Sequence, residues 1–129
     1  MLRLAGKFGV GDRVRLLGVR EDIPQLMAAA DLLVHPARSE TTGTVILEAL
    51  VNGLPVVASA VCGYAEHVTR AGAGAVLPEP FSQSAFIAKL REAQDAGLRE
   101  QWSANAARYG ETQDLYRGLS RAASIIAAP

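Results

Sequence analysis

Two spacings of apolar residues alternate over the first 77 residues of the chain. Short apolar runs bounded by glycine or proline predict buried strands. These runs are Val14–Leu17, Leu32–His35, Val56–Ala58 and Ala75–Leu77. Segments with helical spacing lie between them, at about residues 22–30, 44–51 and 63–70. The first of these has Asp22 as a candidate cap and Pro24 in its first turn. This alternation is typical of an α/β fold with a parallel sheet and flanking helices.

The pattern changes after Pro78 and Pro80, which interrupt the chain. Ser82 follows as a candidate helix cap, and three further helices are predicted. They span about residues 83–96, 99–109 and 114–126. We therefore expect a helical tail over about residues 82–129 that adds no strand to the sheet.

Length and composition narrow the class of protein. A chain of 129 residues, half of them hydrophobic, fits one domain with a real core. Leu2–Phe8 has the pattern of a helix end, so we expect residues 1–129 to form a partial domain that begins inside a structural unit. The 13 basic and 13 acidic residues cancel, which argues against a broad nucleic-acid interface. The single cysteine, Cys62, excludes an internal disulfide, and no apolar run approaches the roughly 20 residues of a membrane span.

Parallel sheets bind ligands beyond the carboxyl ends of their strands. Here those ends lead into loops at residues 18–22, 36–43 and 58–64. The middle loop carries Glu40 and then Gly43, which lies where the next helix begins, among threonines. Free N–H groups at a helix start attract phosphate, and a glycine there lets a ligand approach the backbone. The loop therefore indicates a phosphate or sugar-phosphate ligand.

A second carboxylate, Glu48, follows in an otherwise apolar helix. A buried carboxylate is costly without a partner, and a pair of sugar hydroxyls would be a suitable one. Eight helical residues extend about 12 Å, whereas a glycosidase pair needs about 5 to 9.5 Å. Unless the loop folds back, Glu40 and Glu48 thus fit opposite ends of an extended ligand better than a hydrolase pair. On spacing alone, however, a solvated helix face and a surface loop residue remain the favoured interpretation.

The glutamate pair and its surroundings resemble a known family. Glu40 and Glu48, with seven residues between them, resemble the paired-glutamate motif of retaining glycosyltransferases with the GT-B fold, and residues 27–36 and 48–57 match as well. Three narrower segments are similar to the lipopolysaccharide core glucosyltransferases that add glucose to the inner-core heptose. These segments are residues 60–65, 79–83 and 112–116. The resemblance runs from about Gly11 and implies a Rossmann-like domain, the truncated C-terminal, donor-binding half of a GT-B enzyme.

The resemblance also implies roles for individual residues. Glu48 would bind the ribose hydroxyls of UDP-glucose, and Glu40 would contact the hexose and act in catalysis on the donor face. Backbone N–H groups of Thr42, Gly43 and Thr44 would donate to the sugar and to the β-phosphate.

The uracil site is implied less specifically. Arg20 would lie against the base, with the backbone at Ile23 reading its edge, and a guanidinium stacked on a base is physically reasonable. An exposed loop arginine is the alternative interpretation.

Some residues depart from the family or from metal chemistry. Many relatives have two glycines where this chain has Cys62 and Gly63, and we interpret Cys62 as a small buried apolar residue. His35 is read as a strand-end residue and His67 as a helix-surface residue, because no third ligand has suitable spacing. No Asp-x-Asp pair is present either. No metal or other cofactor is therefore expected.

Two parts of the family's enzyme have no counterpart in this sequence. The basic pair that neutralises the diphosphate is not matched by Arg3 or Lys7, and the N-terminal acceptor domain is missing. We therefore predict little or no transfer by this chain alone. The resemblance implies a UDP-sugar and a lipopolysaccharide core acceptor as partners of the complete enzyme, at the cytoplasmic face of the inner membrane. A non-catalytic nucleotide- or partner-binding module remains the alternative, and another GT-B enzyme such as an epimerase is disfavoured by the narrow segments.

Overall fold

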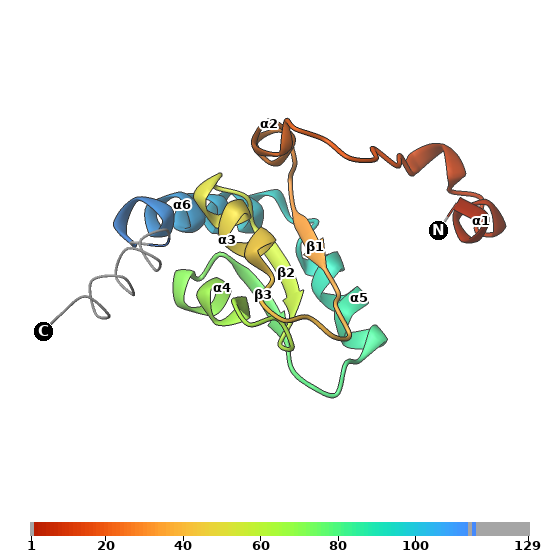
Figure 1. The fold of residues 1–129 in the computed structure, drawn as a ribbon. Coiled ribbons are helices and arrows are strands. Elements are labelled where there is room, and N and C mark those ends of the chain that lie inside the picture. Colours follow the sequence, from red (N-terminus) through yellow and green to blue (C-terminus); the bar gives the residue numbers. More distant parts are fainter. Residues whose placement is uncertain (1, 114, 116–129) are drawn as a thin grey trace, which may run out of the picture.

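A parallel sheet lies at the centre of the computed structural model, which describes residues 2–113 and residue 115 (Figure 1). Within these residues the sheet has the order β1 (Leu33–His35), β2 (Val56–Ser59) and β3 (Gly74–Leu77). Val34 is in register with Val57, and Val57 with Ala75. Three of the four predicted strands and the α/β class are therefore confirmed.

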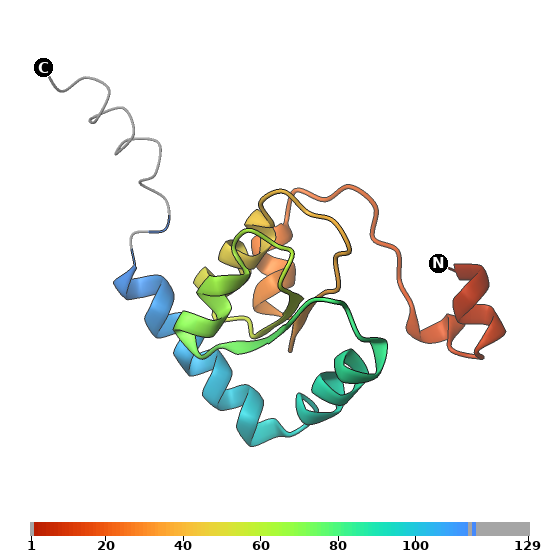
Figure 2. The same ribbon diagram turned by 90° about the horizontal axis from the view of Figure 1, so that it is seen from below.

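Helices cover both faces of the sheet (Figure 2). On one face lie α3 (Thr44–Val51) and α4 (Ala65–Ala71), and α5 (Gln83–Glu92) lies on the other. The core between the sheet, α3 and α4 is apolar and tightly closed. Its largest fully buried side chains are Ile46, Leu50, Val56, Val57 and Val68. The α3 helix, whose pattern is apolar on nearly every side, is thus held against β2 by burial rather than by helix propensity alone.

The long helix α6 (Ala96–Thr112) packs against α3 and α4 and forms hydrogen bonds at their C-terminal ends. Ser103 Oγ donates to the Gly53 carbonyl at 2.7 Å, and Asn105 Nδ2 donates to the Gly72 carbonyl at 2.9 Å. Both carbonyls lie just beyond the last turns of the shorter helices, where helix carbonyls have no partner of their own. These bonds fix the two helices relative to the sheet.

The helical tail follows the predicted pattern with shifted boundaries. Ser82 caps α5 by accepting from the Ala85 N–H at 3.3 Å, as predicted. Asp95 caps α6 through the Leu98 N–H at 2.7 Å, so that α5 ends earlier and α6 begins earlier than the periodicity suggested. The third predicted helix, residues 114–126, lies outside the described residues.

The prediction of a strand at Val14–Leu17 is wrong for the described structure. This segment joins a short 3-10 helix, η1 (Gly11–Arg13), to α2 (Ile23–Ala28), and it is extended at Val14 without being a strand. A strand needs a neighbour for its backbone groups, and none of the described residues lies beside this one. Both of its leucines are largely exposed, Leu16 by 60% and Leu17 by 52%. Figure 1 shows the segment leading away from the sheet to α1 (Leu2–Lys7).

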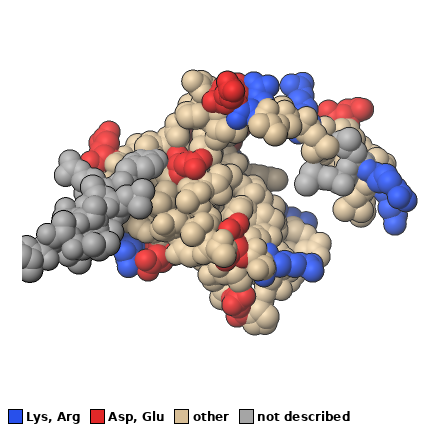
Figure 3. Space-filling model, viewed as in Figure 1, with Lys and Arg blue, Asp and Glu red and all other residues tan. Residues whose placement is uncertain are grey.

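The described helices are all too short or too polar to cross a membrane. Charged side chains of both signs are spread over the face shown in Figure 3. That face carries no broad basic patch among the described residues, which agrees with the balanced charge of the sequence.

Candidate functional site

Two loops meet where β1 and β2 end. The Tyr64 N–H donates to the Thr42 carbonyl at 3.0 Å, and Ser59 Oγ donates to the Ala37 carbonyl at 2.6 Å. A Cβ added at Gly63 would lie only 3.0 Å from the Thr41 carbonyl oxygen, so the loops pack backbone to backbone. Residues 36–43 and 59–64 are therefore fixed against each other at the carboxyl edge of the sheet, where the sequence predicted a ligand.

Gly43 makes the turn from this loop into α3. Its φ of 73° lies in the left-handed region, and a Cβ there would meet Cys62 Cβ at 3.3 Å and Glu40 Cγ at 3.7 Å. Only glycine fits both the conformation and the space. No side chain of the described residues caps α3, so its first N–H groups remain available to a ligand. The helix start for which the sequence predicts an anion-binding role lies at the carboxyl edge of the sheet, beside Glu40.

Glu40 is held beside that helix start. Its Oε1 accepts from the Thr41 N–H at 2.9 Å, and its Oε2 lies 3.7 Å from His35 Nε2. The Glu40 side chain is 29% exposed, so it is neither a free surface group nor a buried one. Burial raises the pKa of the nearby Cys62 thiol, the negative charge of Glu40 raises it further, and a Ser59 hydrogen bond lowers it. Cys62 is 3% exposed, which confirms its interpretation as a small buried residue.

Glu48 lies in the second turn of α3 and is half-buried. Its neighbours Leu47 and Ala49 are buried in the core. Thr44, four residues earlier, is exposed and shares a helix face with Glu48. The same face of α3 therefore presents, in order, the helix start and a carboxylate one turn away.

The other two predicted contacts are not brought to this cluster. Arg20 is exposed and donates through Nε to Asp22 Oδ1 at 2.7 Å. Because its carboxylate is bound by Arg20, Asp22 does not cap α2 with its side chain, although it occupies the N-cap position. Arg20 lowers the pKa of the Asp22 carboxyl, and Asp22 raises that of Arg20. The segment that carries Arg20 and Ile23 meets β1 at the end opposite the Glu40 loop (Figure 1).

The structure agrees with the predicted position of His35 but shows a contact of His67 that the sequence did not predict. His67 was interpreted as a surface residue, but its Nδ1 lies 2.8 Å from Tyr109 Oη, and its ring packs against Tyr64. This contact links α4 to α6 and could not be read from local pattern. His35 was correctly placed at a strand end, but its approach to Glu40 was missed. The available signal was a polar residue at the end of a short apolar run.

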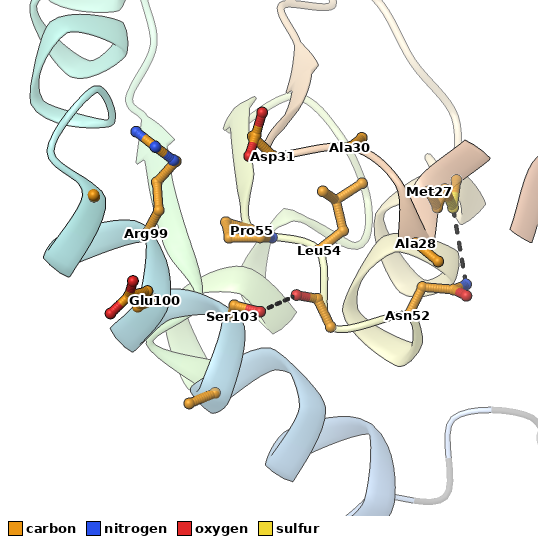
Figure 4. Close-up of a pocket in the computed structure, with 13 residues that line it drawn as sticks. Met27, Ala28, Ala30, Asp31, Asn52, Leu54, Pro55, Arg99, Glu100 and Ser103 are labelled. Atoms are coloured by element: carbon orange, nitrogen blue, oxygen red, sulfur yellow. Dashed lines mark hydrogen bonds between the residues drawn. The ribbon is translucent and has the colours of Figure 1, made fainter. Parts of the chain in front are cut away.

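A separate cavity lies at the amino edge of the sheet, between α2, the end of α3 and α6 (Figure 4). Its volume is about 530 Å³. Asp31, Asn52, Arg99 and Glu100 supply charged or polar groups to its lining, which Met27 and Leu54 make partly apolar. Arg99 Nη1 is already bonded to the Ala93 carbonyl at 2.8 Å. The cavity shares no lining residue with the predicted donor site.

Comparison with known proteins agrees with this geometry. The family model described as "Glycosyl transferases group 1" matches residues 1–109. The lipopolysaccharide glucosyltransferase WaaG of Escherichia coli K12 is 49% identical over 124 residues, which is 95% of this chain and 33% of that protein. A crystal structure of WaaG superposes with a TM-score of 0.92 at 48% identity, covering 98% of this chain and 35% of that one.

A second similar structure was solved with a bound ligand. It is the Anabaena Alr3699/HepE protein in complex with UDP-glucose, which is 29% identical with a TM-score of 0.78. The alignment covers 98% of this chain and 35% of the Anabaena protein. The chain thus spans about a third of the length of these relatives. The predicted GT-B class is confirmed, and the chain belongs to the group 1 glycosyl transferase family.

Proposed function

We propose that this chain forms the donor-binding part of a retaining, UDP-glucose-dependent glucosyltransferase that acts on heptose in the lipopolysaccharide core. The observation that carries the proposal is the uncapped start of α3 at Gly43, with Glu40 fixed beside it at the carboxyl edge of the sheet. The similarity to WaaG over 95% of the chain, and to a protein solved with UDP-glucose, supports the donor and the reaction class.

The positions of these residues allow each of them to bind a different part of the donor. The diphosphate and the sugar would accept hydrogen bonds from the backbone at Thr42, Gly43 and Thr44. Glu48, one turn along α3, would accept from the two ribose hydroxyls, which offset the cost of a half-buried carboxylate. Glu40 would contact the hexose at the other end.

The uracil end requires a change from the described arrangement. Arg20 would have to leave Asp22, and the segment that carries it would have to approach the carboxyl edge of the sheet, for the guanidinium to stack on the base. Exposed ion pairs contribute little in water, so breaking the Arg20–Asp22 pair costs little free energy. The backbone at Ile23 would then read the edge of the uracil.

We further propose that the chain alone transfers glucose slowly or not at all. Departure of UDP requires stabilisation of the charge that develops on its phosphate. The backbone groups at the start of α3 would supply part of it, but the family's basic pair has no match in this sequence, and the chain covers only 33% of WaaG.

Titration of UDP into the chain, followed by calorimetry, tests the proposal. Glu48→Ala should weaken UDP binding about tenfold or more, because a charge-assisted hydrogen bond is worth about 1.5–3 kcal/mol. Glu111→Ala is the matched control, since Glu111 is exposed near the end of α6, away from the site.

Equal affinities of the unaltered chain and Glu48→Ala would refute the ribose assignment. Binding of UDP without turnover of UDP-glucose would support a donor-binding part, whereas sustained transfer would overturn the claim that the chain is inactive alone. A chain that binds no UDP at all would contradict the proposed function.

A further inference from the structure

His35 has a donor position that the described structure leaves unused. It is the last residue of β1, in register with Ala58, so its backbone is fixed by the sheet. Its Nε2 atom is buried and has no hydrogen-bond partner among the described residues. Buried polar atoms of this kind are rare in folded proteins, and each one calls for a partner that the structure does not yet show.

The carboxylate of Glu40 lies close to this nitrogen. Oε1 of that group is already bound by the Thr41 N–H at 2.9 Å, and Oε2 lies 3.7 Å from His35 Nε2. A separation of 3.7 Å is too long for a hydrogen bond, but a movement of less than about 1 Å would make one. The two side chains are similarly shielded, at 25% and 29% exposure.

We infer that His35 is a positioning residue for Glu40, an assignment that rests on the proposed binding of UDP-glucose. With a proton on Nε2, the imidazole donates to Glu40 Oε2 when the hexose occupies the site. Glu40 is then bound on both oxygens, by the backbone at Thr41 and by His35, and its remaining lone pairs point in fixed directions toward the sugar.

This positioning role predicts different effects on the affinities for UDP-glucose and for UDP. Glu40 is proposed to touch the hexose and not the nucleotide, so its orientation should affect UDP-glucose and leave UDP almost untouched. A merely structural histidine would behave differently, because loss of packing at the end of β1 would disturb the loop at Gly43 and weaken both ligands together.

Three substitutions separate these cases by calorimetry with UDP and UDP-glucose. His35→Leu removes the donor, His35→Asn places an amide near the position of Nδ1, and His35→Gln places one near that of Nε2. We expect UDP-glucose affinity to fall about tenfold in His35→Leu and His35→Asn, which is one hydrogen bond to a charged group. His35→Gln should stay within about threefold of the unaltered chain, and UDP affinity should stay within about twofold in all three.

Glu40→Gln provides the reference for the sugar contact. If it lowers UDP-glucose affinity while His35→Leu does not, or if His35→Gln is no better than His35→Leu, the positioning role is overturned and the proposed function stands. If Glu40→Gln also leaves both affinities unchanged, the sugar contact of the proposed function has failed and the role of His35 fails with it. Equal losses for UDP and UDP-glucose in all three His35 variants would show a structural role instead.

A second measurement needs no variant of His35. The chain has two histidines, so their ring nitrogens can be resolved by ¹⁵N NMR and assigned with His67→Gln. We expect His35 as the neutral Nε2–H tautomer, with a shift of Nε2 on addition of UDP-glucose but not of UDP. The Nδ1–H tautomer, or the same response to both ligands, would contradict the assignment.

Discussion

The sheet body, residues 33–112, and the segment before it, residues 2–32, use similar apolar runs with opposite outcomes. Val56 and Val57 in β2 are completely buried, whereas Leu16 and Leu17 are 60% and 52% exposed. The β2 strand has a hydrogen-bonded neighbour on each side, and the run at Leu16 has none among the described residues. Strand propensity measures how well a residue fits a sheet that already exists. The comparison therefore teaches that the partner, and not the run itself, makes the strand.

The largest test of this difference is one truncation made in each region. Leu50→Ala removes a fully buried side chain from α3 and should lower the free energy of unfolding by about 2–5 kcal/mol. Leu17→Ala makes the same chemical change at an exposed position and should alter it by no more than about 0.5 kcal/mol. Urea unfolding followed by circular dichroism measures both. A Leu17→Ala effect as large as that of Leu50→Ala would mean that residues 14–17 are packed in solution.

A smaller effect is expected from two glycines with the same backbone conformation. Gly43 has φ 73° and Gly18 has φ 68°, but a Cβ would meet Cys62 and Glu40 only at Gly43, and nothing within 4 Å at Gly18. Gly43→Ala should cost about 1–3 kcal/mol of stability, because the packed loops prevent relaxation. Gly18→Ala should cost about 1 kcal/mol at most, since its surroundings can yield.

UDP affinity provides a second comparison of the Gly43→Ala and Gly18→Ala variants. Gly43→Ala moves the helix start that is proposed to bind phosphate, so calorimetry should show weaker UDP binding, while Gly18→Ala should bind as the unaltered chain does. Unchanged UDP affinity in Gly43→Ala would separate the stability of this turn from its proposed use.

Local signals explain which parts of the structure could be predicted. The α3 helix, the Ser82 cap and the strands β1 to β3 follow from patterns within a few residues, and all agree with the sequence. The wrong predictions depend on contacts between distant residues. Val14–Leu17 has no neighbouring strand among the described residues, and local pattern cannot show whether such a neighbour exists. His67 contacts Tyr109, which lies 42 positions away in the sequence.

The site divides in the same way. Glu40, Gly43 and Thr44 could be predicted as neighbours because one short loop and one helix start carry all three. The approach of His35 to Glu40 could not, because it depends on how the loop folds back over the end of β1. The place of Arg20 depends on its contact with Asp22 and on the proposed competition of that contact with a base, which the sequence leaves open.

The smallest expected effect concerns that competition, in the segment outside the sheet body. Arg20 lowers the pKa of the Asp22 carboxyl. The NMR resonance of the Asp22 carboxyl carbon should therefore titrate with a pKa below the ordinary value of about 3.9. The contribution of this pair to stability is present above the unfolded-state pKa and is lost as the pH falls through the lowered one. Arg20→Gln should return the titration to its ordinary range and leave unfolding at neutral pH almost unchanged, because both groups are exposed.

Addition of UDP should act in the same direction if Arg20 moves to the base, raising the Asp22 pKa in the unaltered chain but not in Arg20→Gln. An Asp22 titration that ignores UDP in both chains would keep Arg20 bound to Asp22 and remove it from the donor site.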